Sequence, residues 1–297
     1  MQPTVVITGV SSGIGRDAAS YLSKHGYFVF GSVRSESART ELESALPENF
    51  RAVVFDVVDR PAIDAAAKIV ADHLGDHRLT ALINNAGIAE GGPMQLLEDD
   101  RFLRQIQVNV IGTRNVTNAF LPHLGVRDTV QPTAATSSSP RIGRPGKIIN
   151  ISSISGILNT PMNGAYCVSK HAQESLGEIY RRELMQYGID VISIQPGPIR
   201  SELWNKNLGT MERFADSRYS AMIANAEAIM AEAKQEALPA ETISRLIEKI
   251  IEARRPRLSY IVHSQKWHAW LLPKLPVRWT DRLLWKRLNR PLPDETK

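Results

Sequence analysis

Short runs of β-branched and other apolar residues alternate along the chain with longer stretches of mixed polar and apolar residues. Apolar runs of this length are typical of strands buried on both faces, and the longer stretches between them are typical of helices. The predicted strands are therefore residues 4–8, 28–33, 52–55, 81–83, 147–151 and 191–194. This alternation predicts a chain of the α/β class.

The first predicted strand leads directly into a glycine-rich turn and a helix predicted over residues 16–25. Gly9, Gly13 and Gly15 give the spacing G-x-x-x-G-x-G, which differs from the more usual G-x-G-x-x-G. In such a context, glycines allow a tight turn and a close approach to a pyrophosphate, whose charge meets the N–H groups at the helix start. A turn with a purely structural role is the alternative.

Tyr166 and Lys170 are four residues apart, so on a helix they share a face. An ammonium group beside a phenol favours the phenolate, which predicts a lowered pKa for Tyr166. A tyrosine of this kind can exchange a proton with a carbonyl or alcohol oxygen. The alternative is a surface lysine beside a half-buried aromatic ring.

The turn and the tyrosine–lysine pair belong to a longer series of motifs. In chain order these are Thr8-Gly9-x-x-x-Gly13-Ile14-Gly15, Asn84-Asn85-Ala86-Gly87, Asn109, Ser153, Tyr166-x-x-x-Lys170 and Pro196-Gly197. From about residue 3 to about residue 205 the chain resembles the short-chain dehydrogenases/reductases, most closely the hydroxysteroid and retinol dehydrogenase group. The resemblance implies a Rossmann-like fold, and we expect a doubly wound parallel sheet of about seven strands with a helical substrate cap.

The resemblance also implies a role for each catalytic residue. Tyr166 would be the general acid/base, and Lys170 would lower its pKa and bind the nicotinamide ribose. Ser153, chosen over its neighbour Ser152 for its spacing from the tyrosine, would hold the substrate oxygen. Asn109 would hold a water on a proton path to Lys170; a helix-kinking asparagine satisfied by backbone is the alternative.

Further cofactor contacts are implied in the glycine turn, at the strand ends and after the strand at 191–194. With Tyr166, Lys170 and Arg34 they comprise Thr8, Gly9, Ser11, Ser12, Gly13, Ile14, Gly15, Asp56, Val57, Asn85, Ala86, Gly87, Pro196, Gly197, Ile199 and Ser201. Asp56 would lie against the adenine amine. A helix N-cap for the segment after Pro61 is an equally weighted alternative for it.

The end of the second predicted strand bears on the choice of cofactor. NAD-dependent enzymes of such folds place an acidic residue there to bond the ribose 2′-OH. Here Val33 occupies the position and Arg34 follows. Because a guanidinium suits a 2′-phosphate, and Ser11, Ser12 and Ser35 could add hydroxyl groups, the sequence predicts NADP(H). A solvated loop arginine is the alternative for Arg34.

Length and composition limit the remaining possibilities. The 297 residues suit one catalytic domain, which we place at 1–264, and the single cysteine, Cys167, fits a reducing, cytoplasmic compartment. The seven histidines lack metal-ligand spacing, so no metal site is expected. No apolar run is long enough to span a bilayer. Residues 125–146, rich in Ser, Thr and Pro, are interpreted as a flexible insertion at the N-terminal edge of the sheet.

The C-terminal extension, residues 265–297, differs in composition from the rest. Four of the five tryptophans lie in it, and from Arg254 to Arg290 ten Lys/Arg face one acidic residue, Asp281. Trp and Leu alternate there with basic residues at helical spacing, as in helices that lie in a membrane interface. A lid over the substrate pocket, a peripheral membrane anchor and a dimer contact all stay open. No nucleic-acid recognition module accompanies the charge, and homo-oligomers are common in the family.

We therefore expect hydride transfer between NADP(H) and a secondary alcohol or carbonyl group of a lipophilic steroid-, retinoid- or lipid-like substrate. The cap is predicted at about 202–238, and the pocket candidates are Met162, Trp204, Leu208 and Met211. Two alternatives remain: a catalytically silent NADP-binding regulator, and a membrane-associated scaffold on the same fold.

Overall fold

Seven strands within the described residues form one parallel sheet. The computed structural model describes residues 2–126, 142–200, 211–265 and 271–289. The strand order is β3-β2-β1-β4-β5-β6-β7, and Val5 of β1 pairs with Val29 of β2 and Ala81 of β4. The predicted doubly wound sheet is thereby confirmed. The strands are β1 Thr4–Ile7, β2 Phe28–Val33, β3 Phe50–Val54, β4 Ala81–Asn84, β5 Lys147–Ile151, β6 Asp190–Pro196 and β7 Ser259–Val262.

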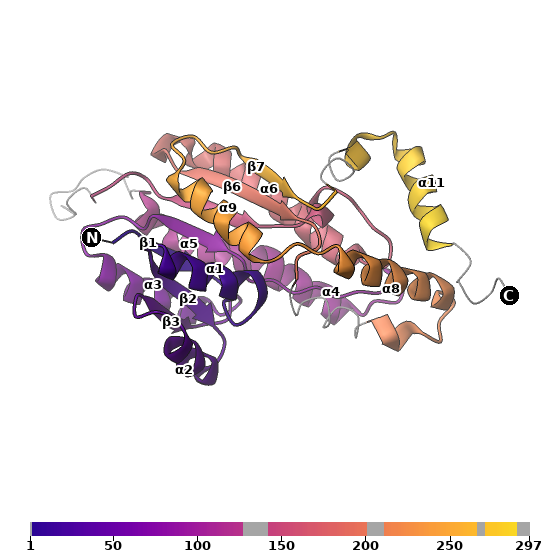
Figure 1. Ribbon diagram of the computed structural model, residues 1–297, viewed down its shortest axis with the longest axis horizontal. Coiled ribbons are helices and arrows are strands. Elements are labelled where there is room, and N and C mark those ends of the chain that lie inside the picture. The colour runs from indigo at the N-terminus through magenta and orange to yellow at the C-terminus, as the bar shows by residue number, and fades with distance from the viewer. Residues whose placement is uncertain (1, 127–141, 201–210, 266–270, 290–297) are drawn as a thin grey trace.

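Helices cover both faces of this sheet (Figure 1). One face packs against α1 (Gly13–Lys24), α2 (Glu36–Ala45) and α9 (Glu241–Glu252). The other packs against α3 (Arg60–Leu74), α5 (Thr113–Leu124) and α6 (Gly164–Leu184). Helix α4 (Asp99–Ile106) leads into α5 through a π-helical segment, Gln107–Gly112. Helix α1 begins within the glycine turn, three residues before its predicted start.

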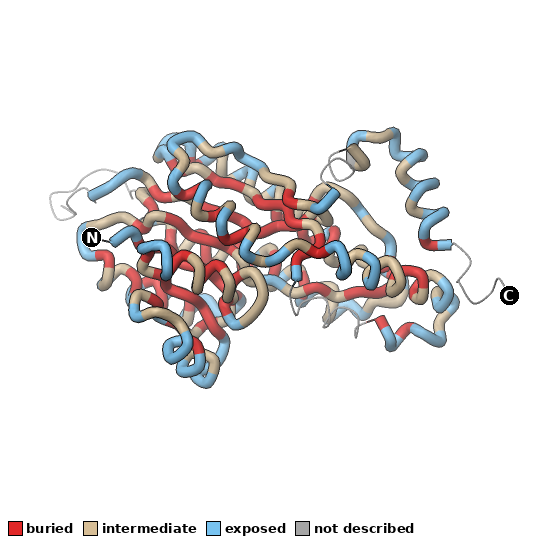
Figure 2. The backbone as a smooth tube through the Cα atoms, in the orientation of Figure 1, coloured by how far each residue is buried: buried red, intermediate tan, exposed pale blue. Residues whose placement is uncertain are grey.

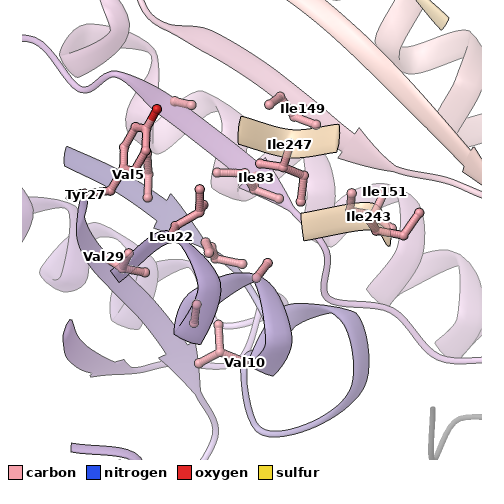
Figure 3. Close-up of a cluster of buried hydrophobic side chains, with 14 of the residues drawn as sticks. Val5, Val10, Leu22, Tyr27, Val29, Ile83, Ile149, Ile151, Ile243 and Ile247 are labelled. Atoms are coloured by element: carbon pink, nitrogen blue, oxygen red, sulfur yellow. The ribbon is translucent and has the colours of Figure 1, made fainter. Parts of the chain in front are cut away.

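The core lies between the sheet and these helices, where most of the red stretches of the tube in Figure 2 gather. Figure 3 shows Leu22 of α1 and Ile247 of α9 packed onto Val5 and Ile83 of the central strands, and all four are fully buried. Each such side chain contributes roughly 1.5–3 kcal/mol on burial. The strand ends that carry the site therefore stand on a rigid base.

A smaller apolar cluster lies beyond the sheet, around α8 (Ser220–Gln235) and α11 (Val277–Leu288). Figure 1 shows these helices projecting from one end of the molecule. Within the described residues, the predicted cap region contains α8 and the short 3-10 helix Glu212–Phe214 that precedes it. Ser201, Trp204 and Leu208 lie outside the described residues. None of the described helices is long and apolar enough to cross a membrane.

Most of the predicted insertion, residues 127–141, lies outside the described residues. On its two sides, Gly146 donates through its backbone N–H to the carbonyl of Leu124 (2.8 Å), and Ile142 donates to that of Asp76 (2.7 Å). Gly146 immediately precedes β5. Both ends of the insertion therefore lie at the N-terminal edge of the sheet, as predicted.

Candidate active site

A cavity of about 1350 Å³ opens at the carboxyl ends of the central strands. It lies where β1 and β4 are neighbours and their connections leave in opposite directions, which is where ligands bind in open parallel sheets. Ligand sites commonly measure about 300–1,000 Å³, so this volume exceeds the need of a single small molecule. One cavity thus extends from the glycine turn to the walls formed by α8 and α11.

The glycine turn forms the floor of this cavity. Gly9 and Gly13 have φ angles of 71° and 59°, in the left-handed region that favours glycine. A Cβ at Gly15 would overlap the carbonyl oxygen of Gly9. Ser12 begins α1 without a side-chain cap, and the first turn of the helix contains no acidic residue. The first N–H groups of α1 are therefore free to meet an anion.

A set of hydrogen bonds beneath the turn ties β1 to β4. The Thr8 hydroxyl oxygen accepts from the backbone N–H groups of Asn85 and Ala86, both at 2.9 Å. The Asn85 amide donates to the carbonyls of Thr8 (2.9 Å) and Gly9 (3.0 Å). Thr8 is buried, and neither it nor Gly15 lines the cavity. These two predicted cofactor residues support the turn from below.

Ser153, Tyr166 and Lys170 all line the cavity. Ser153 follows β5, whereas Tyr166 and Lys170 project from the start of α6. The Lys170 Nζ lies 5.7 Å from the centroid of the Tyr166 ring. Ser153 hydrogen-bonds the Tyr166 side chain, and its oxygen accepts from the backbone N–H of Ser155 at 3.1 Å. The hydroxyl of Ser152 is buried and has no hydrogen-bond partner among the described residues.

The predicted lowering of the Tyr166 pKa is wrong for this structure. Burial raises the pKa of Tyr166 to about 12, although the hydrogen bond from Ser153 acts in the opposite direction. The physical reason is desolvation, because the buried phenolate loses more hydration than its neighbours replace. Burial likewise lowers the pKa of Lys170 to about 8.

The Lys170 ammonium is held by a chain of buried polar groups. It donates to the carbonyl of Ile151 (3.0 Å) and to the Gln173 side-chain oxygen (2.8 Å). The Gln173 amide donates to the Thr113 hydroxyl (3.0 Å), which in turn donates to the carbonyl of Asn109 (2.8 Å). The position of Lys170 is therefore fixed from α5 as well as from its own helix.

Asn109 occupies the π-helical segment and is fully buried. Its side-chain oxygen accepts from the N–H of Ile88, and its amide donates to the carbonyl of Ile88 and to the Ser169 hydroxyl, all at 2.9 Å. The side chain does not line the cavity. It holds the backbone beside Gly87, and its role in a water path stays a prediction.

At the other end of the cavity, Arg34 follows β2 and is exposed on the wall with Ser11 and Ser12. Ser35 instead caps α2, since its oxygen accepts from the N–H of Ala38 at 3.3 Å. Asp56 also lines the cavity.

The N-cap alternative for Asp56 is wrong. Asp59 caps α3, because its side chain accepts from the N–H of Ala62. Asp56 instead accepts from the N–H of Val58 at 3.2 Å.

The wall beyond Tyr166 is largely apolar. Met162 lines it with a φ of 63°, a left-handed conformation that is unusual for a bulky residue. The other predicted pocket residue within the described chain, Met211, also lines it. Further apolar positions come from the segment before Tyr166, from α8 and from the C-terminal region: Leu158, Pro161, Ala226, Ile229, Met230, Ala233, Leu272, Leu284 and Leu288.

Comparison with known families assigns the chain to one family. A family described as short chain dehydrogenase matches residues 3–212. The chain belongs to this family. Of the cofactor residues predicted from it, Gly9, Ser11, Ser12, Gly13, Ile14, Arg34, Asp56, Val57, Asn85, Ala86, Gly87, Tyr166, Lys170, Pro196, Gly197 and Ile199 line the cavity.

Several named reductases and dehydrogenases resemble the chain over much of its length. The NADPH-dependent 3-dehydrocapnine reductase of Ornithobacterium rhinotracheale is 34% identical over 96% of this chain and 97% of its own. The 3-ketodihydrosphingosine reductase of Bacteroides thetaiotaomicron is 33% identical over 73% of this chain and 74% of its own. Retinol dehydrogenase 5 of Homo sapiens is 31% identical over 97% of this chain and 89% of its own.

Two solved structures share the fold, and the first is named as a short-chain dehydrogenase. One from Streptomyces avermitilis has a TM-score of 0.71 at 22% identity, covering 98% of this chain and 99% of that one. The structure of ElxO with NADP bound has a TM-score of 0.69 at 24% identity, covering 90% of this chain and 99% of that one.

Sequence reasoning missed residues that take part in the site through distant contacts. Gln173 lies three residues after Lys170, so on a helix it shares the face of Lys170. Its spacing could have identified it as a partner of the lysine. Thr113 carried no such signal. His263 was missed, and the lid alternative for residues 265–297 named neither Gln265 nor the α11 residues on the wall, because nothing in the local sequence shows which of them face the pocket.

Proposed function

We propose that this short-chain dehydrogenase transfers hydride between NADP(H) and a secondary alcohol or carbonyl group of a lipophilic molecule. The observation that carries the proposal is the convergence of Ser153, Tyr166 and Lys170 on the cavity whose floor is the glycine turn. A silent regulator would have no use for a tyrosine and a serine hydroxyl joined beside an apolar pocket.

The chain's own features fit NADP(H). The glycine turn lines the cavity and contains glycines with left-handed backbone angles. The N–H groups at the start of α1 would bind the pyrophosphate. At the end of β2 no carboxylate opposes a 2′-phosphate, and Arg34 with Ser11 and Ser12 would bind it. The dependence on NADPH of the reductase from Ornithobacterium rhinotracheale agrees with this assignment.

The bound nucleotide supplies the hydride. Ser153 holds the substrate oxygen, and Tyr166 gives that oxygen its proton. Burial raises the pKa of Tyr166 to about 12, so the phenol holds its proton at neutral pH and is the group from which a carbonyl oxygen would take one. The Lys170 ammonium, fixed by Gln173 and Ile151, stabilises the phenolate that remains.

The substrate side favours a lipid. The wall formed by Met162, Met211, Ile229 and Met230 consists of flexible or apolar side chains, which suit bulky apolar ligands. Two relatives are named for 3-ketodihydrosphingosine and retinol, both lipophilic compounds. We favour a keto lipid over a steroid because the apolar wall continues from Tyr166 to α11. A peripheral contact of the extension with a membrane would suit such a substrate.

The test is NADPH oxidation by the purified protein with long-chain 3-keto lipids, retinal, steroid ketones and small aldehydes. Tyr166→Phe should lower kcat by about 10²–10⁴-fold while NADPH binding persists, because only the proton donor is lost. Turnover that survives in Tyr166→Phe would refute the assigned chemistry. Tight NADPH binding without turnover of any compound would favour the regulator.

A further inference from the structure

Helix α11 presents two different faces. The residues toward its C-terminal end that line the cavity are Leu284, Arg287 and Leu288. On the remaining circumference stand large apolar side chains: Trp279 and Trp285 are each 62% exposed, and Leu283 is 51% exposed. Within the described residues, only one of the two apolar sides of α11 is packed against the rest of the chain.

The inner face is attached to α8. Leu288 is buried in the small apolar cluster, and its carbonyl accepts from the Asn225 amide at 3.1 Å. Arg287 forms an ion pair with Glu232 at 3.5 Å, and both residues lie at the cavity wall. These contacts fix the C-terminal end of α11 as part of the substrate pocket.

The outer face has a defined charge pattern. Arg278, Arg282 and Lys286 follow one another at i, i+4 spacing and therefore form one row along the helix, and all three are exposed. On the helical projection this row lies between Trp285 on one side and Trp279 with Leu283 on the other. Trp and basic residues arranged in this way are typical of helices that rest at a membrane interface.

We propose that the outer face of α11 docks onto the surface of an anionic phospholipid bilayer, so that the cavity behind the helix opens at the membrane. The lipophilic substrate in this inference rests on the proposed function, but the membrane-binding surface of α11 does not depend on it. A second copy of the chain is a poorer occupant, because a two-fold contact through this face would bring the row of cations against its own copy. Anionic lipid headgroups complement that row, and the tryptophan rings suit the interface.

The experiment is co-sedimentation of the full chain with phosphatidylcholine vesicles, with and without phosphatidylglycerol, at low and high salt. We expect binding that requires phosphatidylglycerol and weakens with salt. Trp279→Ser with Trp285→Ser, and separately Arg278→Glu with Arg282→Glu and Lys286→Glu, should each weaken binding about tenfold or more. The two sets remove the apolar and the electrostatic contribution independently.

Matched controls lie on exposed positions of other helices. Ile179→Ser on α6 with Met185→Ser directly after it removes a comparable exposed apolar surface, and Lys24→Glu with Lys68→Glu and Lys249→Glu makes the same charge change. Both controls should bind vesicles as the unmodified chain does. Equal loss in the controls and the α11 variants, or no vesicle binding at all, would overturn the proposal.

Kinetics separate this inference from the proposed function. With a keto lipid in vesicles, the α11 variants should show a raised KM, whereas their turnover of a water-soluble aldehyde should be unchanged. Vesicle binding lost only in the α11 variants, without any turnover, would keep the docking surface and reject the proposed reaction. A dimer that dissociates in Trp279→Ser, together with unchanged vesicle binding, would assign the face to a second copy and overturn the proposal.

Discussion

The two ends of the cavity are built in different ways. At the sheet, Thr8, Asn85 and Lys170 are held by buried or partly buried hydrogen bonds that join segments far apart in sequence. At α8 and α11, the described contacts of the wall include a small apolar cluster, the bond from the Asn225 amide to the Leu288 carbonyl, the Gln265–Glu236 hydrogen bond and the Arg287–Glu232 ion pair. The catalytic residues are therefore held by the rigid sheet, whereas the residues that contact the substrate are held by few contacts within the described chain. The substrate wall can change without disturbing the catalytic residues. Variants that affect one end and spare the other test this division.

The largest effect on stability is expected beneath the glycine turn. Thr8→Val keeps the side-chain shape but leaves the N–H groups of Asn85 and Ala86 without their acceptor, which should cost about 2–4 kcal/mol of unfolding free energy. NADPH binding should weaken as well, because the turn loses its support. Urea unfolding and cofactor titration measure both. Thr8→Ser, which keeps the hydroxyl, should behave nearly as the unmodified chain, and equal loss in both variants would contradict the account.

Cofactor choice should change at the end of β2. Val33→Asp with Arg34→Ala introduces a carboxylate and removes the guanidinium, so the ratio of kcat/KM for NADPH over NADH should fall about 10–100-fold. Stability should fall as well, because Val33 is only 2% exposed in the apolar core and the variant places a carboxylate there, whereas Arg34 is exposed. Steady-state kinetics with both nucleotides decide the matter. An unchanged ratio would mean that Arg34 is only a solvated loop residue.

A moderate effect is expected from Gln173, a positioning residue for Lys170. With a Lys170 pKa of about 8, the ammonium loses its proton as pH rises through that value, so activity should fall on the basic side. Gln173→Leu removes the acceptor that favours the ammonium and should lower kcat about tenfold and move this fall to lower pH. Gln173→Glu adds an opposite charge and should move it to higher pH. Identical pH profiles for both variants would rule out the positioning role.

The smallest effect is expected at the cap. Met230→Ala shortens a half-buried side chain on the cavity wall, so unfolding free energy should fall by about 1 kcal/mol or less. The KM for a long-chain substrate should rise several-fold while the kcat for a small aldehyde stays the same. A comparable loss with the small aldehyde would show that α8 supports the catalytic end, contrary to the division proposed here.

The sequence predicted best what depends on neighbouring residues. The glycine turn, the strand ends and the Tyr166–Lys170 pair are local patterns, and they lie on the wall of one cavity in the structure. The direction of the Tyr166 pKa could not be predicted, because it depends on burial by distant segments. The partners of Thr8 and Asn109 were hidden for the same reason: their hydrogen bonds connect remote positions. For Asp56 two local interpretations were equally good, and only the placement of Asp59 at the start of α3 decided between them.

The π-helical segment that holds Asn109 has a consequence for how the gene can change. Such a segment accommodates a residue more than a regular α-helix would over the same turn. Deleting one codon there would remove that extra residue and restore a regular helix, so the flanking helices would keep their orientation but the backbone that presents Asn109 would change. The Asn109 amide could then no longer meet both Ile88 and Ser169. Substitutions that keep the number of residues in this helix can leave the site intact, whereas a change in the number of residues alters the position of Asn109.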